Sequence, residues 1–332
     1  MKRANIRLCV TGSRGKSGVV RLLHRALCAC GLNCRARVTG VVPRDLGPEG
    51  ETPILRHAGA HVAEMKWWLA QLAADTDAVV MENSAVSPDL QTLCPQLLKP
   101  TYTILTNVRL DHSSMWGTTE ESVIRAISGG LPHGGNVILP EAITDKAPLL
   151  YEAEKRALSL IPVKEDGSLP YPWSINIPLA LEACTRHGLD REMALAAMKS
   201  LPPDIADSQV IAVGGGMLAF AFSVNDTEST EEYFLSLGWK REETTLIYNH
   251  RGDRMDRLTS FAPWFSLEWR NKYIIGDKPF ACGLSRYYTK TEDIGALASL
   301  IEKSGLAFGC GNAVYGLPLR LKLAIESGKI KL

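Results

Sequence analysis

Residues 11–18 read Thr11-Gly12-Ser13-Arg14-Gly15-Lys16-Ser17-Gly18. An apolar run at residues 6–10 precedes this stretch, and apolar residues at helical spacing follow it over residues 19–27. A strand, a glycine-rich turn ending in Gly-Lys-Ser and a helix form a phosphate-binding loop, because backbone N–H groups and the positive end of the helix dipole converge on an anion. Lys16 would neutralise phosphate charge, and the Ser17 hydroxyl would bind Mg²⁺. The stretch therefore predicts a site for ATP or GTP.

The loop is two residues shorter than the common Walker form. That form has four residues between its two glycines, which would put a glycine where Val10 stands, whereas only Ser13 and Arg14 separate Gly12 from Gly15. Such a string can also form an ordinary surface turn, but the flanking strand and helix favour the phosphate loop. Ten residues precede the loop, so we expect no further domain ahead of it.

Length and composition narrow the class of protein. The chain has 332 residues, enough for two domains that each bury a core. A balance of 37 basic and 36 acidic residues gives a net charge of +1, which does not favour nucleic acid or an anionic membrane as a partner. No stretch is long enough to cross a membrane and no signal peptide is present, so we expect a cytoplasmic protein. Eight cysteines without paired Cys-x₂-Cys spacing favour free thiols over a zinc site.

Strand-like and helix-like segments alternate along the first half, which predicts a parallel sheet with helices on both faces. After the first strand and helix, the expected strands are residues 35–42, 77–82, 102–106 and 136–139. The expected helices are residues 57–73, 88–98, 120–128, 176–187 and 191–200. Residues 43–53 are rich in Pro and Gly and suggest a loop, and residues 141–172 carry little pattern.

The run Pro202-Pro203-Asp204 predicts a boundary between domains at residues 1–204 and 205–332. Beyond it a hairpin is expected over residues 209–213 and 217–224, followed by strands near 245–248, 273–275 and 306–308 and a last helix at 317–326. The predicted fold is α/β: a P-loop, doubly wound parallel-sheet ATPase domain followed by a smaller Rossmann-like domain.

Three predicted strands of the first domain end in polar residues: Gly12–Ser17 after the first, Glu82 at the end of the second, and Thr106–His112 after the third. Ligands of doubly wound sheets gather outside the carboxyl ends of the strands, so these ends should share one rim. Glu82 with Ser17 would form part of a Mg²⁺ shell, and His112 would bind a second metal or stabilise a transferring phosphoryl group. The alternatives are a solvated carboxylate for Glu82 and a capping or packing role for His112.

The second domain offers a further polar segment, Asn249 to Arg254, after the strand at 245–248. Arg251 could contact a phosphate through two N–H groups, and Asp253 could hold a ribose. The alternative, slightly favoured by spacing alone, is a polar loop in which Asp253 caps the next helix. Residues 309–316 resemble a dinucleotide fingerprint, but Val314 stands where its third glycine belongs, which makes an oxidoreductase a weak alternative.

In order along the chain, these segments resemble the Mur ligase superfamily of ATP-dependent amide ligases, and within it the poly-γ-glutamate synthase branch. The resemblance covers nearly the whole chain. It is carried by Thr11–Ser17, Glu82–Pro88, Thr106–His112, Asn176 with Leu179–Leu181, Asn225–Thr230, Asn249–Arg254 and Gly309–Asn312.

The resemblance implies that ATP phosphorylates a carboxylate, here the γ-carboxyl of glutamate, to an acyl phosphate with release of ADP, and that an amine then displaces phosphate. By the same resemblance, the catalytic residues are Lys16, Asp111 and His112. The nucleotide would be held by Gly12, Ser13, Arg14, Gly15, Lys16, Ser17, Asn107, Asn176, Arg251 and Asp253. Ser17 and Glu82 would bind one Mg²⁺, and His112 a second one beside the acyl phosphate.

Some features depart from the family. We expect no UDP-binding domain ahead of the loop, and therefore no UDP-muramyl substrate. Asp111-His112 is followed by Ser113-Ser114 where relatives often have a further aspartate, and no lysine lies between His112 and Pro132 to be carbamylated. These departures weaken the case for the second metal.

Other functions stay open at this stage. The chain could ligate glutamate to a different small-molecule acceptor, or be a non-catalytic nucleotide-binding regulatory or scaffold protein. A subunit of an amidotransferase ranks last, because the four-cysteine zinc knuckle of such relatives is missing. The sequence also leaves open a membrane-protein partner, which would hold the chain at the inner face of the membrane, and a homo-oligomer.

Overall fold

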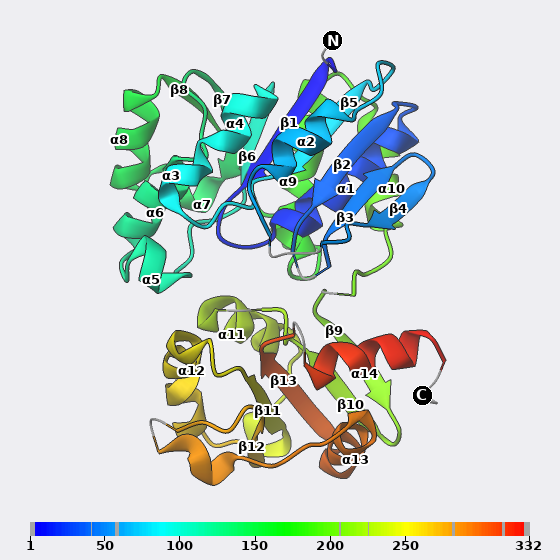
Figure 1. The fold of residues 1–332 in the computed structure, drawn as a ribbon, viewed down its shortest axis with the longest axis vertical. Coiled ribbons are helices and arrows are strands. Elements are labelled where there is room, and N and C mark those ends of the chain that lie inside the picture. Colours follow the sequence, from blue (N-terminus) through cyan, green and yellow to red (C-terminus); the bar gives the residue numbers. More distant parts are fainter. Residues whose placement is uncertain are drawn as a thin grey trace. The chain divides into compact units, whose positions relative to one another are not determined.

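The computed structural model describes residues 4–40, 42–56, 60–205, 207–224, 226–280, 283–313 and 316–328. The chain divides into two compact units, residues 1–202 and 203–332, and each of them is built from helices and strands (Figure 1). This division lies two residues before the boundary expected from the sequence.

The first unit is built on an eight-stranded sheet in the order β4-β3-β2-β5-β1-β6-β7-β8. Its strands are β1 Ile6–Thr11, β2 Cys34–Val38, β3 Arg44–Gly47, β4 Gly50–Pro53, β5 Ala78–Glu82, β6 Tyr102–Leu105, β7 Gly135–Pro140 and β8 Leu158–Val163. The strands from β2 to β8 along this order pair in parallel, and β3 and β4 add an antiparallel hairpin at one edge. The predicted parallel sheet is confirmed.

Ten helices of the first unit lie within the described residues: α1 Lys16–Ala29, α2 Glu64–Ala70, α3 Pro88–Gln91, α4 Leu93–Leu98, α5 Ser113–Trp116, α6 Glu120–Ser128, α7 Glu141–Thr144, α8 Ala147–Lys155, α9 Trp173–Arg186 and α10 Arg191–Lys199. The expectation that residues 43–53 are a loop is wrong, because Arg44–Gly47 and Gly50–Pro53 are the strands β3 and β4. The expected helix at 88–98 is two helices, since Pro95 has no N–H to donate to the Gln91 carbonyl. Of the helix expected at 57–73, residues 64–70 form α2, residues 60–63 and 71–73 are turn or coil, and residues 57–59 lie outside the described residues.

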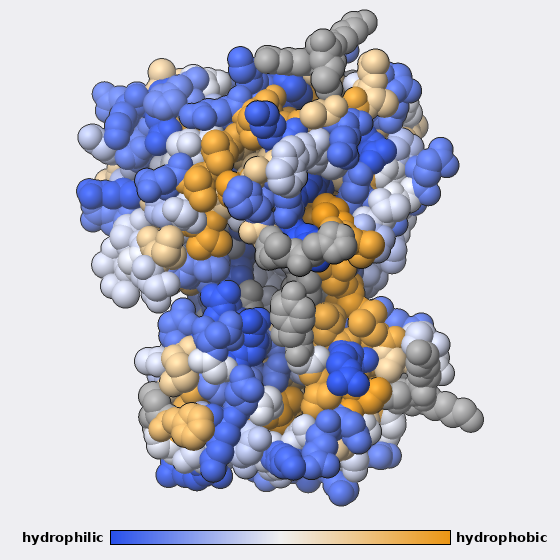
Figure 2. Space-filling model, in the orientation of Figure 1, coloured by the Kyte–Doolittle hydropathy of each residue, from blue (hydrophilic) through white to orange (hydrophobic). Residues whose placement is uncertain are grey.

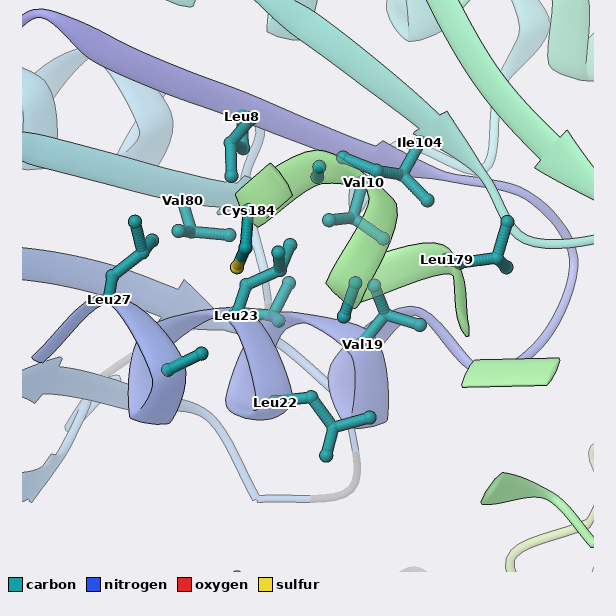
Figure 3. Packing of buried hydrophobic residues seen from close by; sticks show 14 of the residues in the cluster. Leu8, Val10, Val19, Leu22, Leu23, Leu27, Val80, Ile104, Leu179 and Cys184 are labelled. Atoms are coloured by element: carbon teal, nitrogen blue, oxygen red, sulfur yellow. The ribbon is translucent and has the colours of Figure 1, made fainter. Parts of the chain in front are cut away.

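Helices cover both faces of this sheet. On one face α1, α9 and α10 bury a cluster that includes Leu8, Val10 and Val80 of the central strands, and Figure 3 shows these side chains between the sheet and α1. On the other face α2 and α4 pack on Cys9, Val79 and Met81, while α6 and α8 pack beside β7. Because both faces are apolar, the central strands have continuous hydrophobic runs rather than alternation.

The second unit has a five-stranded sheet in the order β12-β11-β13-β10-β9. Its strands are β9 Gln209–Val213, β10 Gly216–Phe220, β11 Thr245–His250, β12 Asn271–Gly276 and β13 Leu306–Gly311, and its helices are α11 Thr227–Ser236, α12 Met255–Phe261, α13 Ile294–Ser304 and α14 Leu317–Glu326. The predicted antiparallel hairpin is β9–β10, and the other strands pair in parallel. Asp226 caps α11, a helix that the sequence pattern did not predict, by accepting a hydrogen bond from the Ser229 N–H at 2.7 Å.

Two buried cations hold the backbone on either side of the boundary. In the first unit, Arg21 of α1 donates from Nη2 to the Pro202 carbonyl at 3.0 Å. In the second unit, Lys322 of α14 donates from Nζ to the carbonyls of Asp204 and Asp207 at 3.1 and 3.0 Å. Each unit thus anchors its own end of the connecting segment. Burial lowers the pKa of Lys322 to about 8.

No helix among the described residues is long and apolar enough to cross a membrane. In Figure 2 the visible surface of each unit is mainly hydrophilic, with apolar residues in smaller patches. A membrane-protein partner and a homo-oligomer stay predictions from the sequence.

The lowered pKa of Lys322 predicts that stability rises with pH between about 8 and the ordinary lysine value of 10.5. In this interval the unfolded chain still binds a proton that the folded chain has released, so raising the pH favours the folded state. Chemical denaturation of the wild type and Lys322→Met should show the wild type gaining about 3 kcal/mol relative to the variant between pH 7 and pH 11. A difference in unfolding free energy that does not change with pH would contradict the assignment.

Candidate active site

The loop between β1 and α1 requires glycine at two positions. Gly12 has φ +126° and Gly15 has φ +77°. A Cβ on Gly12 would lie 2.2 Å from the Thr106 Oγ1 atom, so the neighbouring strand end leaves no space for a side chain. Gly15 is the N-cap of α1 and provides no side-chain acceptor, so the first N–H groups of the helix are available to an anion.

Residues after β6 hold the loop in shape. The Asn107 side chain accepts a hydrogen bond from the Arg14 N–H at 3.0 Å and donates one to the Arg14 carbonyl at 3.2 Å. Thr106 Oγ1 donates to the same carbonyl at 2.5 Å, and the Ser13 N–H donates to the Asn107 carbonyl at 3.2 Å. The Asn107 amide is therefore engaged by the loop backbone.

Asn176, on α9, lies against the other side of the loop. A Cβ on Gly15 would be 3.1 Å from its Oδ1 atom, and one on Gly18 would be 3.5 Å from its Nδ2 atom. This residue is buried, so α9 places its amide at the start of α1. That Asn107 and Asn176 contact the nucleotide remains a prediction from the sequence.

Lys16 lies over the loop and donates to the carbonyls of Gly12 and Ser13 at 2.6 and 3.2 Å. Burial lowers the pKa of Lys16; Glu82 raises it and Arg14 lowers it further. The Ser13 hydroxyl is buried and has no hydrogen-bond partner within the part of the chain that the structure describes. A loop with open helix N–H groups, a lysine and an orphaned hydroxyl fits phosphate oxygens.

Glu82 joins three segments at the end of β5. Its Oε2 accepts from the Ser17 hydroxyl at 3.1 Å and from the Thr39 N–H at 2.7 Å. A Cβ on Gly40 would lie 2.8 Å from Ser17 Oγ, so the segment after β2 closes on this pair. The alternative of a solvated carboxylate is wrong, since Glu82 is only 4% exposed. A hydroxyl and a carboxylate are ligands that Mg²⁺ accepts, and the pair therefore fits that ion.

Asp111 connects the loop to His112. Its Oδ2 lies 2.7 Å from Arg14 Nη2 and 3.3 Å from His112 Nε2. The His112 ring packs edge-on against Trp116, with ring centroids 4.9 Å apart, and the Trp116 indole N–H donates to the Val86 carbonyl at 2.6 Å. His112 is the N-cap of α5, but its side chain makes no capping hydrogen bond. No group of three or more His, Cys, Asp or Glu side chains that could hold a metal ion occurs within the described residues.

The strand register explains why these residues meet. β1 lies between β5 and β6 and is parallel to both, with Val10 opposite Glu82 and Thr11 opposite Leu105. The phosphate loop, Glu82 and the segment from Thr106 to His112 thus emerge at one rim, as predicted. Thr39, which directly follows β2, was not predicted as a site residue because the strand expected at 35–42 extends past it.

In the second unit, Arg251 and Asp253 form a two-pronged ion pair after β11. Arg251 Nε and Nη2 lie 3.0 and 2.7 Å from the two Asp253 carboxylate oxygens, and hydrogen bonding to Arg251 lowers the pKa of Asp253. The alternative of Asp253 as a helix cap is wrong, because the N-cap of α12 is Arg254 and no side chain caps it. Asp277, which sequence reasoning missed, accepts from the Gly252 N–H at 2.7 Å and follows β12.

Asn249 and Asn312 join the ends of β11 and β13. The Asn312 side chain donates to the Asn249 carbonyl at 2.9 Å, and the Asn249 side chain donates to the Asn312 carbonyl at 2.5 Å. The resemblance to a dinucleotide fingerprint extends to Val314 and Tyr315, which lie outside the described residues, as does Asn225 of the earlier motif.

Comparison with known proteins identifies the class. The Mur ligase middle domain matches residues 10–156. Among solved structures, a bifunctional folylpolyglutamate synthase/dihydrofolate synthase from Yersinia pestis superposes with a TM-score of 0.70 at 14% identity, covering 97% of this chain and 89% of that one. E. coli FolC in complex with DHPP and ADP gives 0.68 at 14% identity, covering 99% and 90%. Residues 10–156 are thus similar to the middle domain of Mur ligases, and the class that these matches support is that of the ATP-dependent amide ligases.

The family model that matches the second unit describes a narrower group within that class. The poly-gamma-glutamate synthase CapB C-terminal domain matches residues 209–327. PGA synthase CapB of Bacillus subtilis (strain 168) is 25% identical over 279 residues, which are 77% of this chain and 70% of that protein. Capsule biosynthesis protein CapB of Bacillus anthracis is 25% identical over 285 residues, 79% of this chain but only 61% of that protein. The family expected from the sequence motifs is confirmed.

Gly12→Ala should weaken ATP binding by at least about tenfold, because the new Cβ would collide with Thr106 and displace the loop. Gly31→Ala is the matched control: Gly31 follows the same helix with φ +83°, and nothing lies within 4 Å of its added Cβ. Both variants carry the backbone penalty of a positive φ, but only the first distorts the site. Binding of a fluorescent ATP analogue measures the effect on the site, and thermal melting measures the backbone penalty. Equal affinities of the two variants would refute the collision of the new Cβ with Thr106 as the cause.

Proposed function

We propose that the protein activates the γ-carboxyl of glutamate as an acyl phosphate and joins it to an amine in poly-γ-glutamate-type synthesis. The match of the CapB C-terminal domain over residues 209–327 carries this proposal. The rim of the first unit supports it, because the phosphate loop, a buried carboxylate and the Asp111–His112 pair lie together there.

The loop and its neighbours would hold the nucleotide. Lys16 and the N–H groups at the start of α1 suit the β- and γ-phosphates, and the Ser13 hydroxyl offers a further donor. Mg²⁺ held by Ser17 and Glu82 would supply positive charge to the phosphate oxygens. Arg251 and Asp253 would contact the nucleotide from the second unit, in keeping with the family resemblance.

The reaction balances in two displacements. A γ-carboxylate oxygen of glutamate attacks the γ-phosphorus, the bond to the bridging oxygen breaks, and ADP leaves. The amine nitrogen then attacks the carbonyl carbon, the bond to the phosphate oxygen breaks, and the amine loses a proton as phosphate leaves. His112, oriented by Asp111, would stabilise charge on the phosphoryl group.

A hydroxylamine trap tests the proposal without knowledge of the natural acceptor. With ATP, Mg²⁺, glutamate and hydroxylamine we expect ADP and γ-glutamyl hydroxamate in equal amounts. Lys16→Met should lower the rate by about 100-fold or more, since it removes charge stabilisation at the phosphates. Lys164→Met is the control, because Lys164 is 82% exposed and distant from the loop in sequence. AMP in place of ADP would refute the mechanism, and nucleotide binding without turnover would favour the non-catalytic alternative.

Mg²⁺ dependence separates the roles of Glu82 and His112. Glu82→Gln should raise the Mg²⁺ concentration for half-maximal hydroxamate formation by about tenfold or more, because it removes a charged ligand. His112→Gln should lower the rate at saturating Mg²⁺ and leave that concentration unchanged. If His112→Gln instead shifts the Mg²⁺ requirement, the ring holds a second metal as the family resemblance implies.

A further inference from the structure

A cavity of about 870 Å³ lies in the first unit beside the β3–β4 hairpin and α2. Its wall includes Arg37 at the end of β2, Asp45 of β3, Arg56 of the following segment, and Glu64, Trp67 and Trp68 of α2. Figure 1 shows β2, the hairpin and α2 together at one side of this unit. None of the lining residues belongs to the phosphate loop, and the volume falls in the range of small-molecule sites.

At one point of the wall, two guanidinium groups lie against the same carboxylate. Arg56 donates to both carboxylate oxygens of Glu64, at 2.9 and 2.8 Å, and Arg37 forms an ion pair with the same carboxylate. Two guanidinium groups therefore share one carboxylate. Asp45 is paired with Arg35 instead. A ligand carboxylate would give these two guanidinium groups a second acceptor.

Several buried polar side-chain atoms of this wall also lack hydrogen-bond partners among the described residues. The Arg37 side chain is only 2% exposed, and its Nη1 has no partner within the described residues. The Trp68 indole N–H and one carboxylate oxygen of Asp45 are likewise buried and unpartnered there. Buried polar groups without partners destabilise a fold, so their presence beside a cavity points to a ligand that completes them. That ligand needs acceptors for Arg37 and Trp68 and a donor for Asp45.

We propose that this cavity binds a segment of γ-linked glutamyl chain, an inference that rests on the proposed function. Such a chain carries one α-carboxylate per residue, which suits Arg37 and Arg56, and an amide N–H between residues, which suits Asp45. Its methylene groups match the exposed indole of Trp67. A cavity of this size also accommodates more than one glutamyl residue.

The backbone connects this cavity to the candidate Mg²⁺ ligands. Arg37 lies opposite Met81 in the β2–β5 register, next to Glu82. Two residues after Arg37, the Thr39 N–H binds the Glu82 carboxylate at 2.7 Å. Met81 belongs to the cluster under α2 and α4, so a chain held by Arg37 would lie on that face of the sheet, one residue before the strand end that carries Glu82.

The test is calorimetric binding of a γ-linked glutamyl pentamer to the full chain, with Mg²⁺ and a non-hydrolysable ATP analogue present. We expect Arg56→Gln and Trp67→Ala each to weaken binding about tenfold or more. Arg37 still neutralises Glu64 in the first variant, and Trp67 is 59% exposed, so both variants should fold, which thermal melting checks. Arg125→Gln, on the surface of α6 with 68% exposure, is the control and should bind as the wild type does.

Unchanged affinity in both cavity variants would overturn the proposal, and so would a wild type that does not bind the pentamer. A pentamer with amidated α-carboxylates should not bind; equal affinity for it would refute the charge argument. The hydroxylamine trap is run on the same proteins, because it needs no glutamyl chain. Hydroxamate formation without pentamer binding would reject the cavity while the proposed function stands.

Discussion

The position of β1 between β5 and β6 is the constraint on which the candidate active site depends. Because the three strands run in parallel, their carboxyl ends must emerge together, and each end carries one chemical component of the site. The glycines of the loop then permit the close approach of Thr106 and Asn107. A one-residue shift of either neighbouring strand would move Glu82 or Asn107 away from the loop.

Three carboxylates share a pattern in the first unit, since each lies against two partner residues at once. Glu82 joins Ser17 to Thr39, Asp111 lies between Arg14 and His112, and Glu64 lies between Arg37 and Arg56. A buried carboxylate is tolerated only where several donors surround it. The polar groups of the rim and the cavity are therefore held by cross-links between segments that are distant in sequence, and each such residue has a structural role besides any chemical one.

The grouping of the site residues at one rim could be predicted from the residues that follow each strand. Such a prediction needs only local patterns: apolar runs, the glycine loop and the polar residue after each strand. The β3–β4 hairpin could not be predicted in this way. Its Pro and Gly content is typical of a loop, while its stability comes from pairing with β2 and from the Arg35–Asp45 ion pair. The same holds for the Arg37–Glu64 contact and for Asn107, whose amide serves the loop backbone. These are relations between distant segments, which no single stretch of sequence reveals.

The hydrogen bonds on either side of the boundary bear on how such a chain can evolve. Arg21 binds the Pro202 carbonyl, and Lys322 binds the carbonyls of Asp204 and Asp207. Each unit contains its own sheet, its own core and its own cation bound to the connecting backbone. Pro203 lies between Pro202, which Arg21 binds, and Asp204, which Lys322 binds. The two family matches likewise stop and start on opposite sides of this residue. Recombination at Pro203 would exchange whole halves between ligases without cutting a strand pairing or a buried cation contact, so the chain is modular at a single peptide junction.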